Sequence, residues 1–286
     1  MKIAVIGAKG QLGSDLMKTG ADREGLELVP FGRPELDVTR PESIVESLSG
    51  KGFNAVINTA AYHQVDLCEI EIEKSFQVNA AGVANLADFC QREDLTLLHI
   101  STDFVFSGFG RNEPYGEDDE ARPLNVYGVS KLAGEQILRN RMRRHIIVRS
   151  CGLYGKAGSR EKGTNFPRIM LKLAREGKAI KVVSDQTCTP TPTARLAPII
   201  LDLLTRNQYG TYHATCHGET TWYAFARSIF EIMGIKAEIT PVSSQEYGAR
   251  ARRPAYSVLA NNNLERQGLD RLPYWMQALE EFLDGE

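Results

Sequence analysis

A tyrosine and a lysine lie four residues apart in the stretch NVYGVSK, as Tyr127 and Lys131. Residues at this spacing lie on one face of a helix, so the phenol and the ammonium can meet at a single reacting group. A phenol has a pKa of about 10 and exchanges protons near neutrality only with help from a nearby positive charge. The pair therefore predicts an acid, Tyr127, whose pKa Lys131 lowers. The alternative is a surface tyrosine that packs on the lysine stem.

A third group for the same chemistry follows the largely apolar run TLLHI, where the chain continues with Ser101, Thr102 and Asp103. If this run is a strand of a parallel sheet, Thr102 lies at the carboxyl edge, where such sheets bind ligands. Its hydroxyl could then hold a carbonyl oxygen while Tyr127 supplies a proton. Next to a hydride donor, such a set reduces a ketone. We predict Thr102, Tyr127 and Lys131 as catalytic residues, and the predicted substrate contacts are Thr102, Asp103, Phe104 and Tyr127.

Glycines after the first predicted strand point to the hydride donor. The run KIAVI leads into Gly7, Gly10 and Gly13, a G-x-x-G-x-x-G, and then into a helical pattern. Glycines there allow a tight turn and let the backbone approach a pyrophosphate, which also faces the free N–H groups of the helix start. Because the triplet ends the first strand of a βαβ unit, it favours a dinucleotide site over glycines that only shape a turn. Gln11 and Leu12, inside the turn, belong to the predicted site.

The second predicted strand, LELVPFGR, carries information on the adenosine end of the cofactor. It ends in Gly32 and Arg33 instead of the acid that often holds a ribose 2′-hydroxyl. Arg33 favours a 2′-phosphate and hence NADPH, with NADH as the alternative; a solvated surface arginine is the other interpretation. Small residues after the third strand leave room for a cofactor to cross the strand ends. Besides Tyr127 and Lys131, the remaining predicted cofactor contacts are Asp37, Val38, Thr59, Ala60, Ala61, Tyr62 and Asn79.

Short apolar runs alternate with helix-length segments through the first half of the chain, as in KIAVIGA, LELVPFG and FNAVINTAA. This alternation is typical of a doubly wound parallel α/β sheet, the Rossmann fold. We predict residues 1–155 as a dinucleotide-binding domain. Residues 156–286 are predicted as a smaller, mainly substrate-binding lobe with some segments returning to the sheet. In this lobe TTWYAFARSIFEIMGI and RLPYWMQALEEFLDG are predicted helices, and DQTCTPTPT cannot be a central strand because of its prolines.

The composition excludes several classes of function. With 42% hydrophobic and 24% charged residues the chain is an ordinary globular protein, and its net charge of −2 gives no reason to expect nucleic acid or a membrane as partner. The first apolar run is too short for a signal peptide or a spanning helix, so we expect a cytoplasmic protein. The five cysteines form no C-x-x-C pair. Four histidines lack metal-ligand spacing and are interpreted as packing or polar residues: His63, His99, His213 and His217.

The segments GAKGQLG, NTAAY, STDFVF and YGVSK together resemble the extended short-chain dehydrogenase/reductase family. Within it the chain is most similar to reductases of nucleotide-linked 4-keto-6-deoxy sugars, through LDVTRPESI, PLNVYGVSKLAGE, DQTCTPT, GETTWYAFARSIFE and RRPAYSVLAN. The resemblance covers nearly the whole chain in order. It implies NAD(P)H-dependent reduction of the C4 ketone of a dTDP-linked sugar by Thr102, Tyr127 and Lys131, with the nucleotide sugar held by the C-terminal lobe. It leaves a homodimer open.

Departures from that family pattern carry further expectations. Some members have a glutamate that takes part in a magnesium-mediated dimer contact, whereas this chain has Ala194, so we expect no bound metal. Some members have a tryptophan after the sixth strand, whereas this chain has Gly152, so we expect a differently shaped sugar pocket. The loop at 156–163, KAGSREKG, is either a flap over the substrate or a longer surface loop.

Two other kinds of protein share these family features. A nucleotide-sugar epimerase or dehydratase would hold NAD tightly, and such dehydratases usually have an acid pair after the threonine of the central strand. Here Asp103 is followed by Phe104, which argues against a dehydratase. The other alternative is a non-catalytic, NADP-binding regulatory subunit, like the relatives that bind a methionine adenosyltransferase. Such a subunit need not keep the threonine, tyrosine and lysine, so their joint presence favours an enzyme.

Overall fold

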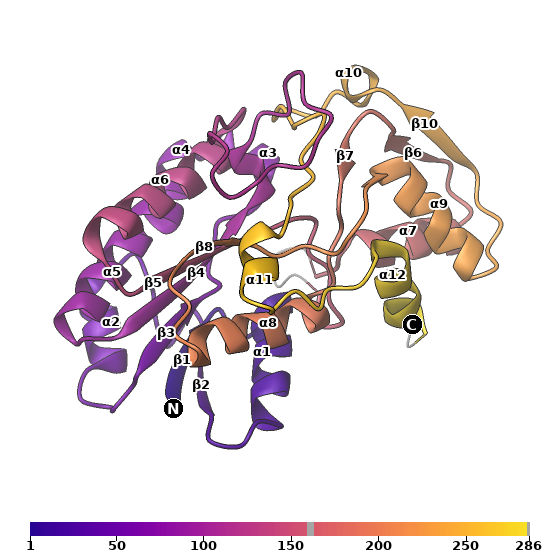
Figure 1. Ribbon diagram of the computed structural model, residues 1–286. Helices are drawn as coiled ribbons and strands as arrows, with labels where there is room; N and C mark the ends of the chain where they lie inside the picture. Colours follow the sequence, from indigo (N-terminus) through magenta and orange to yellow (C-terminus); the bar gives the residue numbers. More distant parts are fainter. Residues whose placement is uncertain (159–162, 285–286) are drawn as a thin grey trace.

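The centre of the protein is a six-stranded parallel sheet with the order β2-β1-β3-β4-β5-β8, seen in a computed structural model that describes residues 1–158 and 163–284 (Figure 1). Most of its strands are runs of apolar residues, which suits a sheet covered by helices on both faces. The predicted doubly wound fold is confirmed. The strands are β1 (Lys2–Ile6), β2 (Glu27–Phe31), β3 (Ala55–Asn58), β4 (Thr96–Thr102), β5 (His145–Ser150) and β8 (Gly210–His213).

The strand order reverses beside β1. The chain passes from β1 to β2 on one side and then to β3 on the other side. At such a reversal the connections leave in opposite directions, and a crevice opens at the carboxyl ends of the two strands. The loops that follow β1 and β3 therefore border one crevice.

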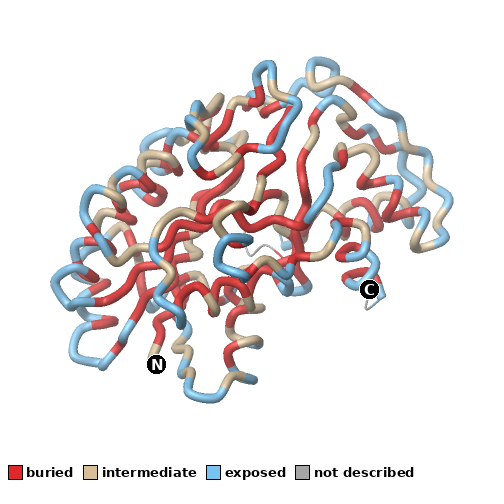
Figure 2. The backbone as a smooth tube through the Cα atoms, viewed as in Figure 1, coloured by how far each residue is buried: buried red, intermediate tan, exposed pale blue. Residues whose placement is uncertain are grey.

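Helices cover both faces of the sheet (Figure 1). α1 (Gln11–Ala21) and α8 (Thr193–Thr205) pack against each other on one face. Each face has its own apolar core, and most of the sheet between them is buried (Figure 2). The other face carries α2 (Pro41–Leu48), α5 (Gly82–Arg92) and α6 (Val126–Arg141), and the short helical segments are α3 (Val65–Cys68), α4 (Ile72–Phe76), the π-helical η1 (Gln77–Ala81) and the 3-10 turn η2 (Asp103–Val105).

A smaller lobe, on the right in Figure 1, is built from the C-terminal part of the chain. Its core is rich in aromatic rings, such as Phe166 and Trp222, whose centroids lie 4.8 Å apart. The elements of the lobe are α7 (Phe166–Arg175), β6 (Ile180–Val183), β7 (Thr187–Cys188), β9 (Thr220–Thr221), α9 (Trp222–Ile232), β10 (Ile239–Val242), α10 (Ser244–Tyr247) and α12 (Trp275–Leu283).

The local predictions for this lobe are confirmed. α9 begins after Thr221, whose hydroxyl oxygen accepts a 3.1 Å hydrogen bond from the Ala224 N–H and so caps the helix. α12 lies within the predicted terminal helix. The proline-rich segment contributes β7, which pairs with β9 in a separate two-stranded sheet and not with the central one.

Parts of the second half of the chain return to the central sheet. α8 packs on α1, β8 pairs with β5, and α11 (Asn262–Arg266) packs beside β8. The division of the chain at residue 155 stays a prediction. Residues 159–162 of the loop at 156–163 lie outside the described residues, so both alternatives for that loop stay predictions too. Of the helices that the structure describes, none combines the length and the apolar character needed to cross a membrane.

Candidate active site

A cavity of about 940 Å³ lies between the strand ends and the C-terminal lobe. Its sheet side includes Gly7 after β1, Thr59 after β3 and Thr102 at the end of β4. Every residue that the sequence predicted for the site lines this cavity, with the exception of Asn79. The lobe side includes Phe166, Gln186, Cys188, Trp222, Tyr247 and Arg253.

The glycine turn after β1 is required by space and by backbone conformation. Gly7 has a φ of 80°, and a Cβ there would lie 2.5 Å from the Thr59 hydroxyl oxygen. A Cβ on Gly13 would lie 2.3 Å from the Gly7 carbonyl oxygen, so only glycine lets α1 pack this closely. Gly10 has an ordinary φ of −81°, and its Cβ would meet the Gly7 carbonyl oxygen at 3.2 Å. No side chain within the described ranges caps α1, so its first N–H groups are available to an anion.

These contacts predict different results for two glycine substitutions. Gly10→Val should leave the protein folded and abolish dinucleotide binding, because the branched side chain is added where the turn borders the cavity. Gly13→Ala should instead destabilise the fold, because its Cβ meets the backbone of the turn. Thermal unfolding and a fluorescence titration with NADPH separate the two effects. An unchanged NADPH affinity in folded Gly10→Val protein would contradict the placement of the cofactor.

The side chains of Gln11 and Leu12 contact other parts of the protein and are not available to a ligand. The Gln11 Nε2 donates to the Leu153 carbonyl at 3.3 Å, and its Oε1 accepts from the Gly155 N–H at 3.0 Å. Leu12 is buried in the apolar core shared with α8. The backbone of these two residues is therefore the part that remains available to a ligand.

Arg33, Asp37 and Val38 line the cavity where the chain leaves β2. The Arg33 side chain is 60% exposed, and its Nε lies 4.0 Å from an Asp37 carboxylate oxygen. Asp37 also accepts hydrogen bonds from the Thr39 N–H at 2.9 Å and from the Thr39 hydroxyl at 2.7 Å. Burial alone would raise the pKa of Asp37, but the Thr39 hydrogen bonds and the Arg33 charge hold it below its ordinary value. Arg33 is thus an exposed cation at the rim of the cavity.

The segment after β3 forms the wall between the two strand ends. The Thr59 hydroxyl donates to the Ile6 carbonyl at 2.7 Å and ties this wall to β1. Ala60, Ala61 and Tyr62 follow it along the cavity. Asn79 lies one layer behind, where its Oδ1 accepts from the Tyr62 N–H and its Nδ2 donates to the Tyr62 carbonyl, both at 2.9 Å. Asn79 therefore fixes the wall from the rear instead of bordering the cavity.

All three predicted catalytic residues line this one cavity. α6 begins after Asn125, whose side-chain oxygen accepts a 2.8 Å hydrogen bond from the Gly128 N–H, and this cap sets the register of Tyr127 and Lys131. A Cβ on Gly128 would lie 2.2 Å from the Phe104 carbonyl oxygen, so glycine lets α6 approach the end of β4. Thr102 is the last residue of β4, and its hydroxyl donates to Asp103 Oδ1 at 3.0 Å and accepts from the Phe104 N–H at 3.2 Å.

The predicted lowering of the Tyr127 pKa by Lys131 is wrong in this structure. Burial raises the pKa of Tyr127 well above its ordinary value, and the influence of the Thr102 hydroxyl opposes this only in part, while the charge of Asp103 raises it further. The physical reason is that Lys131 is itself buried and directs its hydrogen bonds elsewhere. A raised pKa keeps the phenol protonated at neutral pH, which is the form that a proton donor needs.

Lys131 is only 1% exposed, and its Nζ is held by β4. Nζ lies 2.6 Å from the Ile100 carbonyl oxygen and 3.0 Å from His99 Nε2. Burial lowers the pKa of Lys131 to about 7, and the negative charge of Glu135 opposes this shift. His99, which the sequence suggested as a packing residue, therefore contacts a predicted catalytic residue. Its signal was its position two residues before Ser101, because residues at that spacing in a strand face the same helix.

Asp103 and Phe104 border the cavity in different ways. The Asp103 carboxylate is buried and accepts from the Thr102 hydroxyl at 3.0 Å and from the Ser257 hydroxyl at 2.6 Å. Burial raises the pKa of Asp103 above its ordinary value, although these hydrogen bonds oppose it. The Phe104 ring packs edge-on against the Tyr127 ring, with centroids 6.0 Å apart. Phe104 thus orients the phenol, while Asp103 is engaged by neighbouring hydroxyls.

Gly152 is linked to an aromatic residue that the sequence analysis did not assign to the site. Gly152 has a φ of 54°, and a Cβ there would lie 3.1 Å from the Trp222 ring. Trp222 is the first residue of α9, packs on Phe166 and lines the cavity. An aromatic wall is therefore supplied here by α9. The sequence alone did not reveal it, because Gly152 and Trp222 lie far apart in the chain.

Arg253 is a second cavity residue that sequence reasoning missed. Its Nη2 donates to Asp66 Oδ2 at 2.7 Å, and its Nη1 donates to the Ala251 carbonyl at 3.1 Å. These bonds fix a guanidinium at the edge of the cavity, and a fixed guanidinium can hold phosphate oxygens. The available signal was the basic run before Pro254 in the segment RRPAYS.

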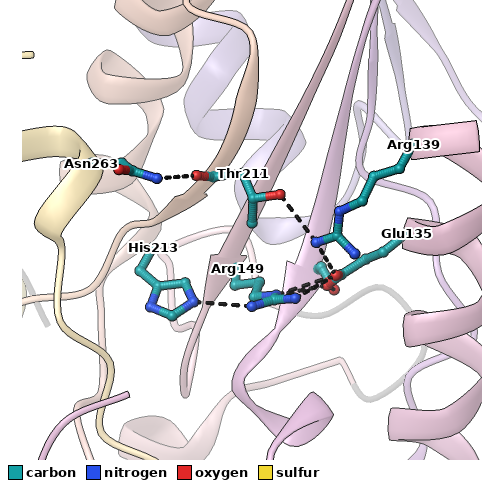
Figure 3. Close-up of polar contacts among 7 residues, drawn as sticks. Glu135, Arg139, Arg149, Thr211, His213 and Asn263 are labelled. Atoms are coloured by element: carbon teal, nitrogen blue, oxygen red, sulfur yellow. Dashed lines mark hydrogen bonds and ion pairs between the residues drawn. The ribbon is translucent and has the colours of Figure 1, made fainter. Parts of the chain in front are cut away.

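A buried ion-pair network ties α6 to the central sheet (Figure 3). Glu135 is fully buried, and its Oε2 accepts from the Arg149 guanidinium at 2.7 Å. The same carboxylate accepts from the Ser101 hydroxyl at 2.5 Å and from Arg139 at 2.9 Å. Arg149 also lies 3.3 Å from His213 Nε2. The network therefore fixes the helix that carries Tyr127 against β4 and β5.

The chain is similar to known proteins along its whole length. The family described as the RmlD substrate binding domain matches residues 1–286. The spore coat polysaccharide biosynthesis protein SpsK of Bacillus subtilis is 37% identical over 282 residues, which cover 99% of this chain and 96% of that protein. A crystal structure of a dTDP-4-dehydrorhamnose reductase from Clostridium acetobutylicum has a TM-score of 0.94 at 38% identity, covering 99% of both chains. A Bacillus anthracis dTDP-4-dehydrorhamnose reductase in complex with NADP has a TM-score of 0.93 at 36% identity, covering 100% of this chain and 99% of that one.

Proposed function

The chain belongs to the RmlD substrate binding domain family, and on that premise we propose that it uses NADPH to reduce the C4 ketone of dTDP-4-dehydro-L-rhamnose to dTDP-L-rhamnose. The observation that carries the proposal is one cavity with the glycine turn on one side and Thr102, Tyr127 and Lys131 on another. Two solved structures that carry the reductase name match nearly the full length of the chain, which supports the same reaction here.

The residues around the cavity fit a nicotinamide dinucleotide. A Cβ on Gly7 would collide with Thr59 and a Cβ on Gly13 with the backbone of the turn, so the glycines allow the tight turn whose backbone can approach a pyrophosphate. Arg33 is the candidate partner of a 2′-phosphate, and Lys131 is the candidate partner of the nicotinamide ribose. When bound, the reduced nicotinamide supplies a hydride to the ketone carbon.

The residues of the chain handle the ketone oxygen. The Thr102 hydroxyl turns its one proton from Asp103 to this oxygen, and Tyr127 gives the oxygen its phenolic proton as negative charge develops there. An alkoxide is much more basic than a phenolate, so a phenol with a raised pKa still transfers its proton. One hydride to C4 and one proton to its oxygen convert the ketone to a secondary alcohol. The Lys131 ammonium then stabilises the phenolate that is left on Tyr127.

A direct assay tests the proposed reaction. Purified protein is mixed with NADPH and dTDP-4-dehydrorhamnose generated in situ, and NADPH oxidation is followed by absorbance. We expect oxidation that depends on the keto sugar and yields dTDP-L-rhamnose, with weaker activity on UDP-linked and GDP-linked keto sugars. An absence of turnover with every keto sugar would reject the reductase in favour of a regulatory subunit. An inverted sugar with no net NADPH consumption would instead identify an epimerase.

Arg33→Ala should weaken NADPH binding more than NADH binding. The guanidinium at the cavity rim is 60% exposed and is the cation placed to meet a 2′-phosphate, which NADH lacks. Titration of both cofactors by intrinsic fluorescence gives the two dissociation constants. A matched control is Arg40→Ala, another exposed arginine of this region that lies outside the cavity lining and should leave both constants unchanged. Equal losses for NADPH and NADH in Arg33→Ala would remove this assignment.

We also propose a cytoplasmic location, where the sugar nucleotides and the cofactor are found. The nucleotide sugar is the proposed small-molecule partner, and a homodimer that needs no metal at Ala194 stays a prediction. Size-exclusion chromatography with and without a chelator shows whether the protein is a dimer and whether the dimer needs a metal. A dimer that dissociates on chelation would reject the metal-free expectation.

A further inference from the structure

Two of the five cysteines border the active-site cavity. All five lie within the described ranges and are free thiols, but only Cys151 and Cys188 line the cavity. These two residues are 2% and 3% exposed, so the cavity is the open space from which a small molecule can reach them. The reaction proposed above uses neither thiol, and their presence at this wall needs its own explanation.

The two segments that carry these cysteines run side by side. Tyr154, shortly after β5, pairs with Pro192 in a parallel bridge. Two residues earlier on each segment, a Cβ on Gly152 would lie 3.1 Å from the Cα of Pro190. The cysteines precede this contact by one residue and by two. Paired strands lie about 4.8 Å apart, inside the range of about 4.4–6.8 Å between Cα atoms that a disulfide spans. The spacing of the two segments therefore suits a disulfide.

The side chains of the two cysteines also interact. The Cys188 thiol and burial raise the pKa of Cys151, and the carboxyl of Asp103 raises it further. Cys151 therefore keeps its proton at neutral pH, and its sulfur reacts only when that proton can leave. Asp103 is the neighbouring group that can take it.

Asp103 connects this thiol pair to a predicted catalytic residue. Its Oδ1 accepts from the Thr102 hydroxyl at 3.0 Å, and its Oδ2 accepts from the Ser257 hydroxyl at 2.6 Å. Burial raises the pKa of Asp103, and the Cys151 thiol is one of the groups that oppose this rise. A chemical change at Cys151 is therefore felt by the carboxyl that contacts Thr102.

We propose that Cys151 and Cys188 form an oxidation site, at which a hydroperoxide converts the thiol pair to a disulfide and thereby slows the proposed reductase. The effect on turnover rests on the proposed function, whereas the formation of the disulfide does not. A hydroperoxide is the fitting oxidant, because it is small enough to enter the cavity and accepts two electrons in one step.

The reaction has two balanced steps. Cys188 reacts first, because the raised pKa of Cys151 disfavours its thiolate. The Cys188 sulfur attacks one oxygen of the hydroperoxide, the O–O bond breaks, and the thiol proton leaves with the other oxygen as an alcohol, or as water from hydrogen peroxide. The Cys151 sulfur then attacks the Cys188 sulfenic acid, the S–O bond breaks, and the Cys151 proton leaves with the hydroxide as water. The two thiols lose two electrons, and the hydroperoxide gains them.

Other roles explain the thiol pair less well. Buried cysteines often only fill space in an apolar core, but these two lie at a cavity wall beside a buried carboxyl. In the part of the chain that the structure describes, no group of three histidine, cysteine, aspartate or glutamate side chains could hold a metal ion. A reactive thiol pair is the role that remains.

A disulfide here changes the surroundings of Thr102. Oxidation removes the Cys151 thiol that opposes the raised pKa of Asp103, and it links the two cavity segments covalently. A misplacement of about 1 Å near reacting groups lowers turnover by about 10²-fold. We therefore expect the oxidised protein to reduce dTDP-4-dehydrorhamnose about 10²-fold more slowly, and a dithiol reductant to restore the rate.

Peptide mapping tests the site directly. The protein is treated with hydrogen peroxide, its remaining thiols are alkylated, and it is digested with trypsin. Cleavage after lysine and arginine gives the peptides 150–156 and 182–195, which contain Cys151 and Cys188 and no other cysteine. We expect a species in which these two peptides are joined, with the sum of their masses less two hydrogen atoms. It should disappear after treatment with dithiothreitol, and the rate of NADPH oxidation in the same samples should fall and recover with it.

Three variants make the result specific. Cys188→Ser should give no joined peptide and should keep its own untreated activity after exposure to peroxide. Cys151→Ser should stop at the first step and leave a sulfenic acid on Cys188, which dimedone traps. Cys216→Ala is a matched control, because Cys216 is also 2% exposed but lies outside the cavity lining. This variant should form the disulfide as the wild type does.

The peptide map is independent of turnover, so the failure of this proposal and that of the reductase can be told apart. Absence of the joined peptide from peroxide-treated wild type would overturn the proposal without any variant, which covers a variant that does not fold. A joined peptide with unchanged turnover, or an equal loss of activity in peroxide-treated Cys188→Ser, would overturn the effect on the reductase. An untreated wild type that reduces no keto sugar would reject the reductase, while the joined peptide would still support the oxidation site.

Discussion

Replacing Tyr127 by phenylalanine should lower the turnover of the keto sugar by about 10²–10⁴-fold, the usual effect of losing a positioned general acid. Phenylalanine keeps the ring and its edge-on packing against Phe104 at 6.0 Å, so the shape of the cavity is retained. Thr102 still holds the ketone oxygen, but no proton reaches it as charge develops. The loss should therefore fall on kcat, with NADPH affinity nearly unchanged.

Initial rates of NADPH oxidation, with dTDP-4-dehydrorhamnose generated in situ, measure this effect. Tyr209→Phe is a matched control, because it also removes a phenolic hydroxyl, but from a tyrosine that is 38% exposed and lies outside the cavity. That variant should turn over at the wild-type rate. Equal rates for the wild type and Tyr127→Phe would refute the assignment of the proton donor.

The fold could be predicted because its signals are local. Alternating apolar runs and helix-length segments need no knowledge of distant contacts, and Gly10 and Gly13 are constrained by the turn that contains them. Helix caps are local signals too. Asn125 caps the start of α6 and thereby fixes the positions of Tyr127 and Lys131 on that helix. The predicted catalytic residues came from combining such local signals with the rule that parallel strands end at one edge.

The features that escaped prediction depend on contacts between distant segments. His99 resembles a core residue until β4 is placed against α6, where His99 meets Lys131 and Ser101 meets Glu135. Residues two apart in a strand can face residues four apart in a helix, as His99 and Ser101 face Lys131 and Glu135. Only the packed structure shows which face of the strand meets which face of the helix. The pKa of Tyr127 also required the fold, because burial decides it more than its neighbour in the helix does.

Glu135→Leu should lower the free energy of unfolding by about 3–5 kcal/mol, since removing one partner of a buried ion pair leaves the other charge uncompensated. Glu135 is fully buried and Arg149 is 2% exposed, so the guanidinium would remain without its carboxylate (Figure 3). Burial would raise the pKa of Glu135, but Arg149, Arg139 and Ser101 hold it below its usual value of 4.5. The stabilisation is therefore complete above pH 4.5 and is lost as the pH falls through the lowered pKa. Urea unfolding at neutral and acidic pH measures both the size and this pH dependence.

A second ion pair in the same protein shows how much of the expected stabilisation depends on burial, because its charged atoms are equally close. Arg227 and Glu231 also lie 2.7 Å apart, but their side chains are 55% and 62% exposed. Glu231→Leu should cost only about 0.2–1 kcal/mol, because water already solvates both charges. The double change Glu135→Leu with Arg149→Leu should recover part of the stability, since no unpaired charge is left in the core. If Glu135→Leu cost no more than Glu231→Leu, the buried network would contribute little to holding α6, and the placement of Tyr127 would have to rest on apolar packing alone.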